Sequence, residues 1–199
     1  MTTDIGTAEF EVGVDADLLS GRWFSLVPIA PKHHGPLYEM ALREENSFRW
    51  RYRGAIPPFP AFEQSLYAGV MCQFVVCPND RPDAVAGLVV AYNASPQDGH
   101  CYVSALSHAQ TSPGVIEAVL LFLRYLFRHW PLRKIYMEAL EFNLPQYRSA
   151  IEMGFLQEEG HLRSHHFFDD RYWDMFLYSI GRADAEKFES QFEFLKPPT

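Results

Sequence analysis

The sequence predicts a single α/β (α+β) domain with a mixed, mostly antiparallel sheet and helices on both faces. Three short apolar segments at 72–77, 84–93 and 100–108 are separated by turns rich in Pro, Asn, Asp and Gly, which is typical of an antiparallel meander. An apolar helix is expected over 115–130, followed by a strand over 133–140. Because a helix between two strands makes a crossover, the strands at 100–108 and 133–140 are expected to run parallel.

The remaining elements are predicted from apolar spacing and from the residues that begin and end helices. Asn143 is a suitable N-cap for a helix, and Gly154 is a suitable stop. In chain order we expect a strand over 21–29, a helix over 37–45, a Pro-rich loop over 51–60, a helix over 62–71, a helix over 144–153, and two closing strands over 155–167 and 171–180.

The 115–130 helix carries few charges. Glu117, Arg124 and Arg128 are spaced 7 and 4 residues apart, which places them in one narrow stripe. The rest of the helix is nearly all apolar, so most of its circumference is expected to be buried.

The domain is expected to span residues 18–181. An acidic arm over 1–17 is expected to be loosely held, and a tail over 182–199 places Phe188, Phe192 and Leu195 at helical spacing. The tail and the closing strands are the surfaces we consider for a homodimer.

Composition excludes several classes of function. The formal net charge of -8 argues against DNA binding and against docking on anionic membranes. Three cysteines, no signal peptide and no apolar run long enough to span a bilayer predict a cytoplasmic protein. Glu and Asp outnumber Lys and Arg, and the one basic cluster, Arg49 to Arg53, interleaves with aromatic residues. This cluster suits an anionic or aromatic acceptor or an RNA, or it is a solvated loop.

Several ordered residues between Gly21 and Ile180 carry a resemblance to a known family. They are Asn143, the helix end Gly154-Phe155, the stretch Glu159-Gly160 with Arg163, and Asp174 within an apolar strand. In this pattern the chain resembles the GNAT N-acetyltransferase superfamily, and within it the branch of the acetyltransferases of ribosomal-protein N-termini.

The resemblance implies direct transfer of an acetyl group from acetyl-CoA to a primary amine of a small molecule or a protein N-terminus. It also implies that the parallel strands splay apart at the cofactor cleft. In this arrangement the backbone of the strand over 100–108 binds the pantetheine arm. The loop after it and the start of the 115–130 helix bind the pyrophosphate, and Asn143 lies beside the arm. The residues concerned are Tyr102, Val103, Ser104, Ala105 and Leu106 for the arm, and Gln110, Gly114, Val115 and Ile116 for the pyrophosphate.

The chain departs from the family pattern at two places. Pro113 stands where the phosphate loop has its first glycine, so one N–H donor is missing. Ala150 stands where many members carry the tyrosine that acts as the acid. Tyr147, one helical turn earlier, is the alternative acid, and Glu138 and His108 are the candidate bases.

Each of these residues also has an ordinary structural interpretation. In this interpretation Glu138 faces solvent or pairs with Arg133 or Lys134, and His108 is an ordinary loop histidine. Asn143 only caps a helix, and Tyr147 only packs. A histidine- and aspartate-rich stretch matches no structural zinc spacing, so we expect no metal; it comprises His161, His165, His166, Asp169 and Asp170.

Two alternative functions therefore stay open. One is a catalytically silent binding module with the same fold. The other is an acyltransferase that uses a longer acyl-CoA, an acyl carrier protein or an aminoacyl-tRNA as donor.

Overall fold

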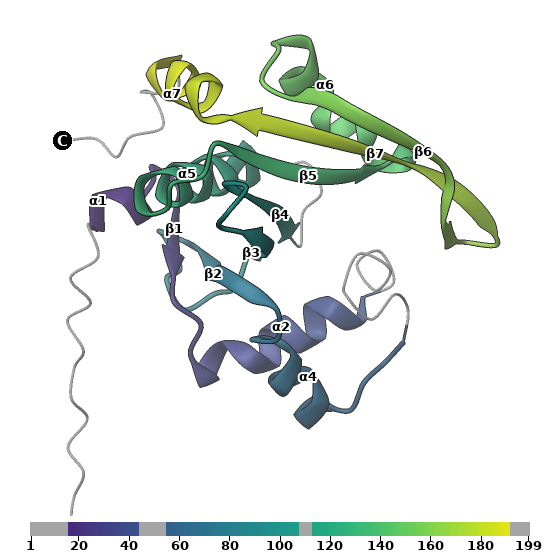
Figure 1. Cartoon of the computed structure of the whole chain (residues 1–199). Helices are drawn as coiled ribbons and strands as arrows, with labels where there is room; N and C mark the ends of the chain where they lie inside the picture. Colours follow the sequence, from purple (N-terminus) through teal and green to yellow (C-terminus); the bar gives the residue numbers. More distant parts are fainter. Residues whose placement is uncertain (1–15, 44–54, 108–112, 192–199) are drawn as a thin grey trace, which may run out of the picture.

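The computed structural model describes residues 16–43, 55–107 and 113–191. Within these residues seven strands form one sheet in the order β1-β2-β3-β4-β5-β7-β6 (Figure 1). Neighbouring strands are antiparallel except β4 and β5, which are parallel, as the sequence predicted. The strands are β1 (Phe24–Val27), β2 (Val70–Pro78), β3 (Gly87–Ser95), β4 (His100–Ser107), β5 (Lys134–Leu140), β6 (Gln157–Phe168) and β7 (Arg171–Gly181).

Helices lie on both faces of this sheet, which confirms the predicted fold class. They are α1 (Ala16–Leu19), α2 (Pro31–Leu42), α4 (Phe59–Ser65), α5 (Pro113–His129), α6 (Leu144–Glu152) and α7 (Arg182–Gln191), with a 3-10 turn η1 (Glu141–Asn143) before α6. None of the helices in the described part is long and apolar enough to cross a membrane.

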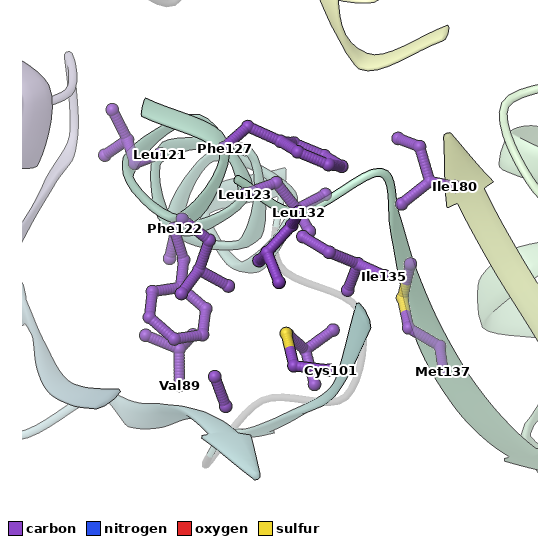
Figure 2. Packing of buried hydrophobic residues seen from close by; sticks show 14 of the residues in the cluster. Val89, Cys101, Leu121, Phe122, Leu123, Phe127, Leu132, Ile135, Met137 and Ile180 are labelled. Atoms are coloured by element: carbon purple, nitrogen blue, oxygen red, sulfur yellow. The ribbon is translucent and has the colours of Figure 1, made fainter. Parts of the chain in front are cut away.

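The larger core lies between α5 and one face of the sheet. Phe122 and Leu123 of α5 pack over Val89, Cys101 and Ile135 of the central strands (Figure 2). Each of these side chains is at most 2% exposed, and burying an aliphatic or aromatic side chain completely contributes about 1.5–3 kcal/mol. The predicted burial of most of the long helix is therefore confirmed.

A second core on the opposite face joins α2 and α4 to the sheet. Leu37 and Met40 of α2 and Phe62 of α4 pack against Val75 and Leu88, on β2 and β3. This core extends across β1 to β3 to Leu106 near the end of β4, and it includes no residue of β5 among the described residues.

Helix α2 begins earlier than predicted. The expected helix over 37–45 starts at Pro31 and contains Pro36. Pro31 occupies the first position of the helix, where its missing N–H costs nothing. Pro36 lacks one internal hydrogen bond at a cost of about 3 kcal/mol, and complete burial of Leu37 and Met40 offsets this loss.

Two other boundaries differ from the prediction. The helix expected over 62–71 is α4, which starts at Phe59 and ends at Ser65, and Val70 and Met71 already belong to β2. Asn143 stands at the N-cap position of α6, but its side chain makes no capping hydrogen bond because η1 has already made its backbone helical. Gly154 ends this helix with a φ of 70°, as predicted.

The first strand is shorter than predicted because the residues before it bind a buried carboxylate. Glu117 is completely buried, and it accepts hydrogen bonds from the backbone N–H groups of Arg22 (2.6 Å), Trp23 (3.0 Å) and Phe24 (2.9 Å). A Cβ at Gly21 would lie 2.5 Å from the Glu117 carboxyl carbon, so only glycine fits there. Glu117 therefore does not belong to a solvent-exposed stripe with Arg124 and Arg128.

Helices lie at both ends of the described residues, close to the predicted domain limits of 18–181. These limits stay predictions. Helix α1 begins at Ala16, inside the expected arm, and Leu19 in it is buried. Helix α7 covers the start of the expected tail, whereas Phe192 and Leu195 lie outside the described residues.

Candidate active site

Strands β4 and β5 part from one another halfway along their length. Their ladder begins at His100 and Lys134 and ends at Val103 and Met137, although β4 continues to Ser107 and β5 to Leu140 (Figure 1). Beyond that point β4 stays paired with β3, and β5 stays paired with β7. Along 104–106 and 138–140, the backbone N–H and C=O groups that point away from β3 and β7 pair with no strand of the described chain, and we call this unpaired stretch the opening.

The predicted pantetheine-binding residues divide at this opening. Ser104, Ala105 and Leu106 follow the last ladder pair and lie along the free edge of β4. Tyr102 and Val103 precede it, and they pair with Tyr136 and Met137. Ser104, Ala105 and Leu106 therefore have backbone groups available at the opening. The backbone groups of Tyr102 and Val103 are occupied by pairing with β5.

The predicted pyrophosphate-binding residues lie at the start of α5. Pro113 is the first residue of this helix, a position that needs no N–H. Gly114 and Val115 follow in the first turn, where backbone N–H groups have no intrahelical acceptor. Ile116 is 55% exposed on the helix surface. His108 and Gln110 lie outside the described residues.

Glu138 lies directly after the last ladder pair, on the face opposite α5. Its carboxylate lies beside the hydroxyl of Tyr92 on β3, within reach of a hydrogen bond. Burial raises the pKa of Tyr92, and the charge of Glu138 and the hydroxyls of Tyr102 and Tyr147 raise it further. Tyr92 therefore stays protonated and remains a donor to Glu138.

Glu138 is exposed, as its structural interpretation allows, but neither of the two basic residues considered as partners pairs with it in the described structure. Lys134 forms an ion pair with Glu159, and the Arg133 Nε–H donates to the carbonyl of Asp98 at 2.7 Å. The hydroxyl that meets the Glu138 carboxylate is that of Tyr92, a residue that the sequence did not single out.

Tyr147 packs as its structural interpretation expects, and its role as acid stays a prediction. Its ring is partly buried and packs against the larger core from α6. It also lies close enough to Tyr92 to influence the pKa of that hydroxyl. The candidate base Glu138 and the candidate acid Tyr147 thus both lie within electrostatic reach of the Tyr92 hydroxyl. Asn143 lies one residue before α6, at the end of η1.

A row of tyrosines crosses the sheet beside Glu138. Tyr92, Tyr102 and Tyr136 are register partners on β3, β4 and β5, with ring centroids 5.9 Å and 5.2 Å apart. We call these three residues the tyrosine row. Alternation within each strand indicates which residues share a face, but the register that aligns the three strands is not readable from the sequence.

The histidines of the β6–β7 hairpin make ordinary contacts. His161 Nε2 lies 2.7 Å from Asp174 Oδ2, and the Ser164 N–H donates to Asp174 Oδ1 at 2.7 Å. These partners lower the pKa of Asp174, the Ser164 N–H most strongly. The described part of the chain holds no group of three His, Cys, Asp or Glu side chains that is arranged to bind a metal.

An apolar pocket of about 270 Å³ lies between α5 and the ends of β1 to β4. Phe24, Val89, Ala105 and Ala118 contribute to its wall, and Arg81 is its charged residue. The pocket includes none of Glu138, Tyr92 and Tyr147, but Ala105 and Leu106 of the predicted pantetheine-binding segment line it, so it borders the predicted donor site.

Solved structures share this architecture. A GCN5-related N-acetyltransferase from Brucella melitensis has a TM-score of 0.71 and 23% identity, over 90% of this chain and 85% of its own. The chain has the GNAT fold. The spermidine N-acetyltransferase of Vibrio cholerae, in complex with CoA and spermine, has a TM-score of 0.65 and 16% identity, over 82% of this chain and 98% of its own. RimL, a ribosomal L7/L12 alpha-N-protein acetyltransferase in complex with coenzyme A, has a TM-score of 0.67 and 11% identity, over 82% and 96%.

The predicted resemblance is thus confirmed at the level of the GNAT fold. No protein-family model and no curated protein matches the chain. At these identities the shared fold does not transfer an activity, which has to be argued from the site.

Proposed function

We propose that the protein is an N-acyltransferase that moves an acetyl group from acetyl-CoA directly to a primary amine of a small molecule or a protein N-terminus. The observation that carries this proposal is the convergence of Glu138, Tyr92 and Tyr147 where β4 and β5 part. Solved structures with the same fold support it, since two of them are named for acetylating amines and are CoA complexes.

The chain offers a matching set of groups for the donor. The backbone groups of Ser104 to Leu106 that point away from β3 suit the amide groups of a pantetheine arm, which binds as an added strand. The first turn of α5 suits a pyrophosphate, because its N–H groups and the helix dipole favour an anion. Pro113 at the first helical position leaves the N–H groups of Gly114 and Val115 in place. When bound, acetyl-CoA supplies the acetyl group as an activated thioester.

Glu138 is the base in this proposal. Its carboxylate accepts a proton from the acceptor ammonium, and the freed nitrogen lone pair forms the bond to the thioester carbonyl carbon. The Tyr92 hydroxyl orients the carboxylate. His108 stays the alternative base.

Tyr147 is the acid. Its hydroxyl donates a proton to the sulfur as the carbon–sulfur bond breaks, and the second proton of the attacking nitrogen restores this hydroxyl, so the products are the N-acetyl amide and the free thiol. Transfer occurs within a ternary complex and needs no covalent intermediate on the enzyme.

The decisive experiment combines binding and turnover. Calorimetric titration with acetyl-CoA, free CoA and a longer acyl-CoA is followed by thiol release with a panel of amines. We expect Glu138→Gln to lower kcat by about 10²–10⁴ and leave the Kd of acetyl-CoA unchanged. Glu152→Gln, a matched change at an exposed glutamate of α6, is expected to leave both unchanged. Equal turnover in the wild type, Glu138→Gln and Tyr147→Phe contradicts both assigned roles.

The alternatives give different results in the same experiment. Binding of CoA without turnover of any amine indicates a silent module, which Ala150 still favours. Lack of binding to every CoA species indicates another donor, an acyl carrier protein or an aminoacyl-tRNA. The basic cluster Arg49 to Arg53 that such a donor needs lies outside the described residues. All three cysteines are free, which supports a reducing compartment such as the cytoplasm.

A further inference from the structure

The tyrosine row lies on the sheet face that carries Glu138. Its side chains are only partly covered by other residues. Each of its three side chains is half-buried, so each ring keeps an accessible part. The apolar core under α2 and α4 does not include the row, as far as the described residues extend. The row is therefore a surface of aromatic rings that leads to the candidate base.

Residues of opposite charge lie on either side of the tyrosine row along β5. Glu138 lies two residues after Tyr136 on β5, about 7 Å further along the strand. Lys134 lies two residues before Tyr136, and its Nζ is 5.7 Å from the Tyr136 ring centroid. His100 lies on the same side, with its ring 5.4 Å from that of Tyr136.

We propose that the tyrosine row is the acceptor subsite and that it selects a primary monoamine with an aromatic body, rather than a polyamine. This inference rests on the proposed function and names its substrate class. The ammonium group of the acceptor pairs with Glu138, and its ring packs on Tyr102 and Tyr136, since aromatic pairs gain beyond the area that they bury. A short alkyl linker spans the distance between the two.

Lys134 selects against a second positive charge on the acceptor. A polyamine that extends from Glu138 over the row places its next ammonium beside the Lys134 ammonium. Lys134 already lies over the face of Tyr136, so this ring has less to offer another cation. The ion pair with Glu159 holds the Lys134 ammonium over the Tyr136 ring.

The test compares an aromatic monoamine, an aliphatic monoamine and a polyamine. Thiol release is measured with acetyl-CoA and phenethylamine, butylamine or spermidine. We expect kcat/KM for phenethylamine to exceed that for butylamine by about tenfold or more, and spermidine to be the poorest acceptor. Tyr136→Leu is expected to raise the KM for phenethylamine and to leave that for butylamine and the Kd of acetyl-CoA unchanged. The matched control is Tyr172→Leu, at a 65% exposed tyrosine of the β6–β7 hairpin, which is expected to change nothing.

A second variant keeps the proposal testable if Tyr136→Leu fails to fold. Lys134→Gln leaves the rings in place, and we expect it to raise kcat/KM for spermidine relative to phenethylamine. A wild type that prefers spermidine, or a Tyr136→Leu variant that affects both monoamines equally, overturns the proposal.

Direct binding separates this proposal from the proposed function. Phenethylamine is titrated against the protein with and without acetyl-CoA, and tyrosine fluorescence is followed. Binding that Tyr136→Leu weakens, in a protein that shows no turnover, keeps the subsite and rejects the acetyltransferase. Turnover of aliphatic amines without any binding of phenethylamine keeps the acetyltransferase and rejects the subsite.

Discussion

At the scale of single residues, Glu117 is a buried carboxylate whose bonding partners are all backbone N–H groups from residues 22 to 24. Its position five residues into α5 places it near the positive end of that helix. Three donors and the dipole together compensate for loss of water around the charge. A side chain that looks like part of a solvated stripe in the sequence thereby joins the first strand to the long helix.

Glu117→Gln is expected to lower the free energy of unfolding by about 2–4 kcal/mol. The amide replaces one acceptor oxygen by an NH₂ group that faces a backbone N–H, so one buried donor loses its partner. Urea denaturation measures the change, and Glu152→Gln, at an exposed site, is expected to stay within about 0.5 kcal/mol. We call the three hydrogen bonds from residues 22–24 to Glu117 the Glu117 clamp. An unfolding free energy equal to that of the wild type would show that this clamp does not contribute to stability.

His33 predicts a pH dependence of stability. The side chain is 3% exposed, its Nδ1 accepts the Ala30 N–H at 3.0 Å, and its buried Nε2 has no partner in the described structure. Burial lowers the pKa of His33, assisted by the charges of Lys32 and His34. A lowered histidine pKa means that the folded state binds fewer protons than the unfolded state, so stability rises with pH.

The contribution of His33 is complete above the ordinary histidine pKa of about 6.5 and is lost as the pH falls below it. We expect His33→Gln to show a smaller loss of unfolding free energy between pH 7.5 and pH 5 than the wild type, because the amide cannot gain a proton. Denaturation curves across this range give the two slopes. Equal slopes mean that His33 protonates as easily in the folded chain as in the unfolded one.

At the scale of elements, Arg182 holds the end of α5. Its guanidinium donates to the carbonyls of Phe127 (2.7 Å), Trp130 (2.8 Å) and Leu132 (2.9 Å). Carbonyls at a helix C-terminus have no intrahelical donor, and a planar fork of N–H groups satisfies several at once. The start of α7 is thereby attached to the connection between α5 and β5.

Arg182→Ala is expected to destabilise the protein by about 2 kcal/mol or more, since three carbonyls lose a charged donor. Arg182→Lys restores only part of this, because an ammonium cannot reproduce the fork. Chemical denaturation of both variants, with Arg128→Ala at an exposed position of α5 as control, tests the order. A lysine variant as stable as the wild type contradicts the role of the planar group.

Elements defined by local patterns were predictable from the sequence. The β2–β4 meander, the long α5 and the parallel β4–β5 pair follow from turn residues, apolar periodicity and crossover geometry. The start of α2 was missed because Pro31 and Pro36 normally end helices, and burial of side chains from α2 decides otherwise.

The candidate site was predictable in part for a related reason. Glu138 and Tyr147 were named from their places in the chain. Tyr92 was missed because its contact with Glu138 depends on the register of β3, β4 and β5, which only the folded sheet defines.

At the scale of the whole molecule, the sheet consists of two antiparallel parts. Strands β1 to β4 form one part and β5 to β7 the other, and four residue pairs join them. A donor bound between the strands contacts both parts. Ligands that bind only the folded state stabilise it in proportion to the logarithm of their concentration.

Acetyl-CoA is therefore expected to raise the Tm, by an amount that grows with its concentration, and to slow amide hydrogen exchange at 104–107 and 138–140. Exchange in the β6–β7 turn around Asp169 and Asp170 serves as an internal control and is expected to be unaffected. Protection confined to other segments places the donor elsewhere.

The Glu117 clamp has a consequence for synthesis on the ribosome. Its donors and its acceptor are 93 to 95 residues apart in the chain. Residues 22–24 leave the exit tunnel early, and their N–H groups stay hydrated until the first turn of α5 emerges several seconds later, at about 5–20 residues per second. The edge of the sheet can therefore close only after more than half of the chain has been translated, so truncated nascent chains expose β1 as an unsatisfied edge that chaperones recognise.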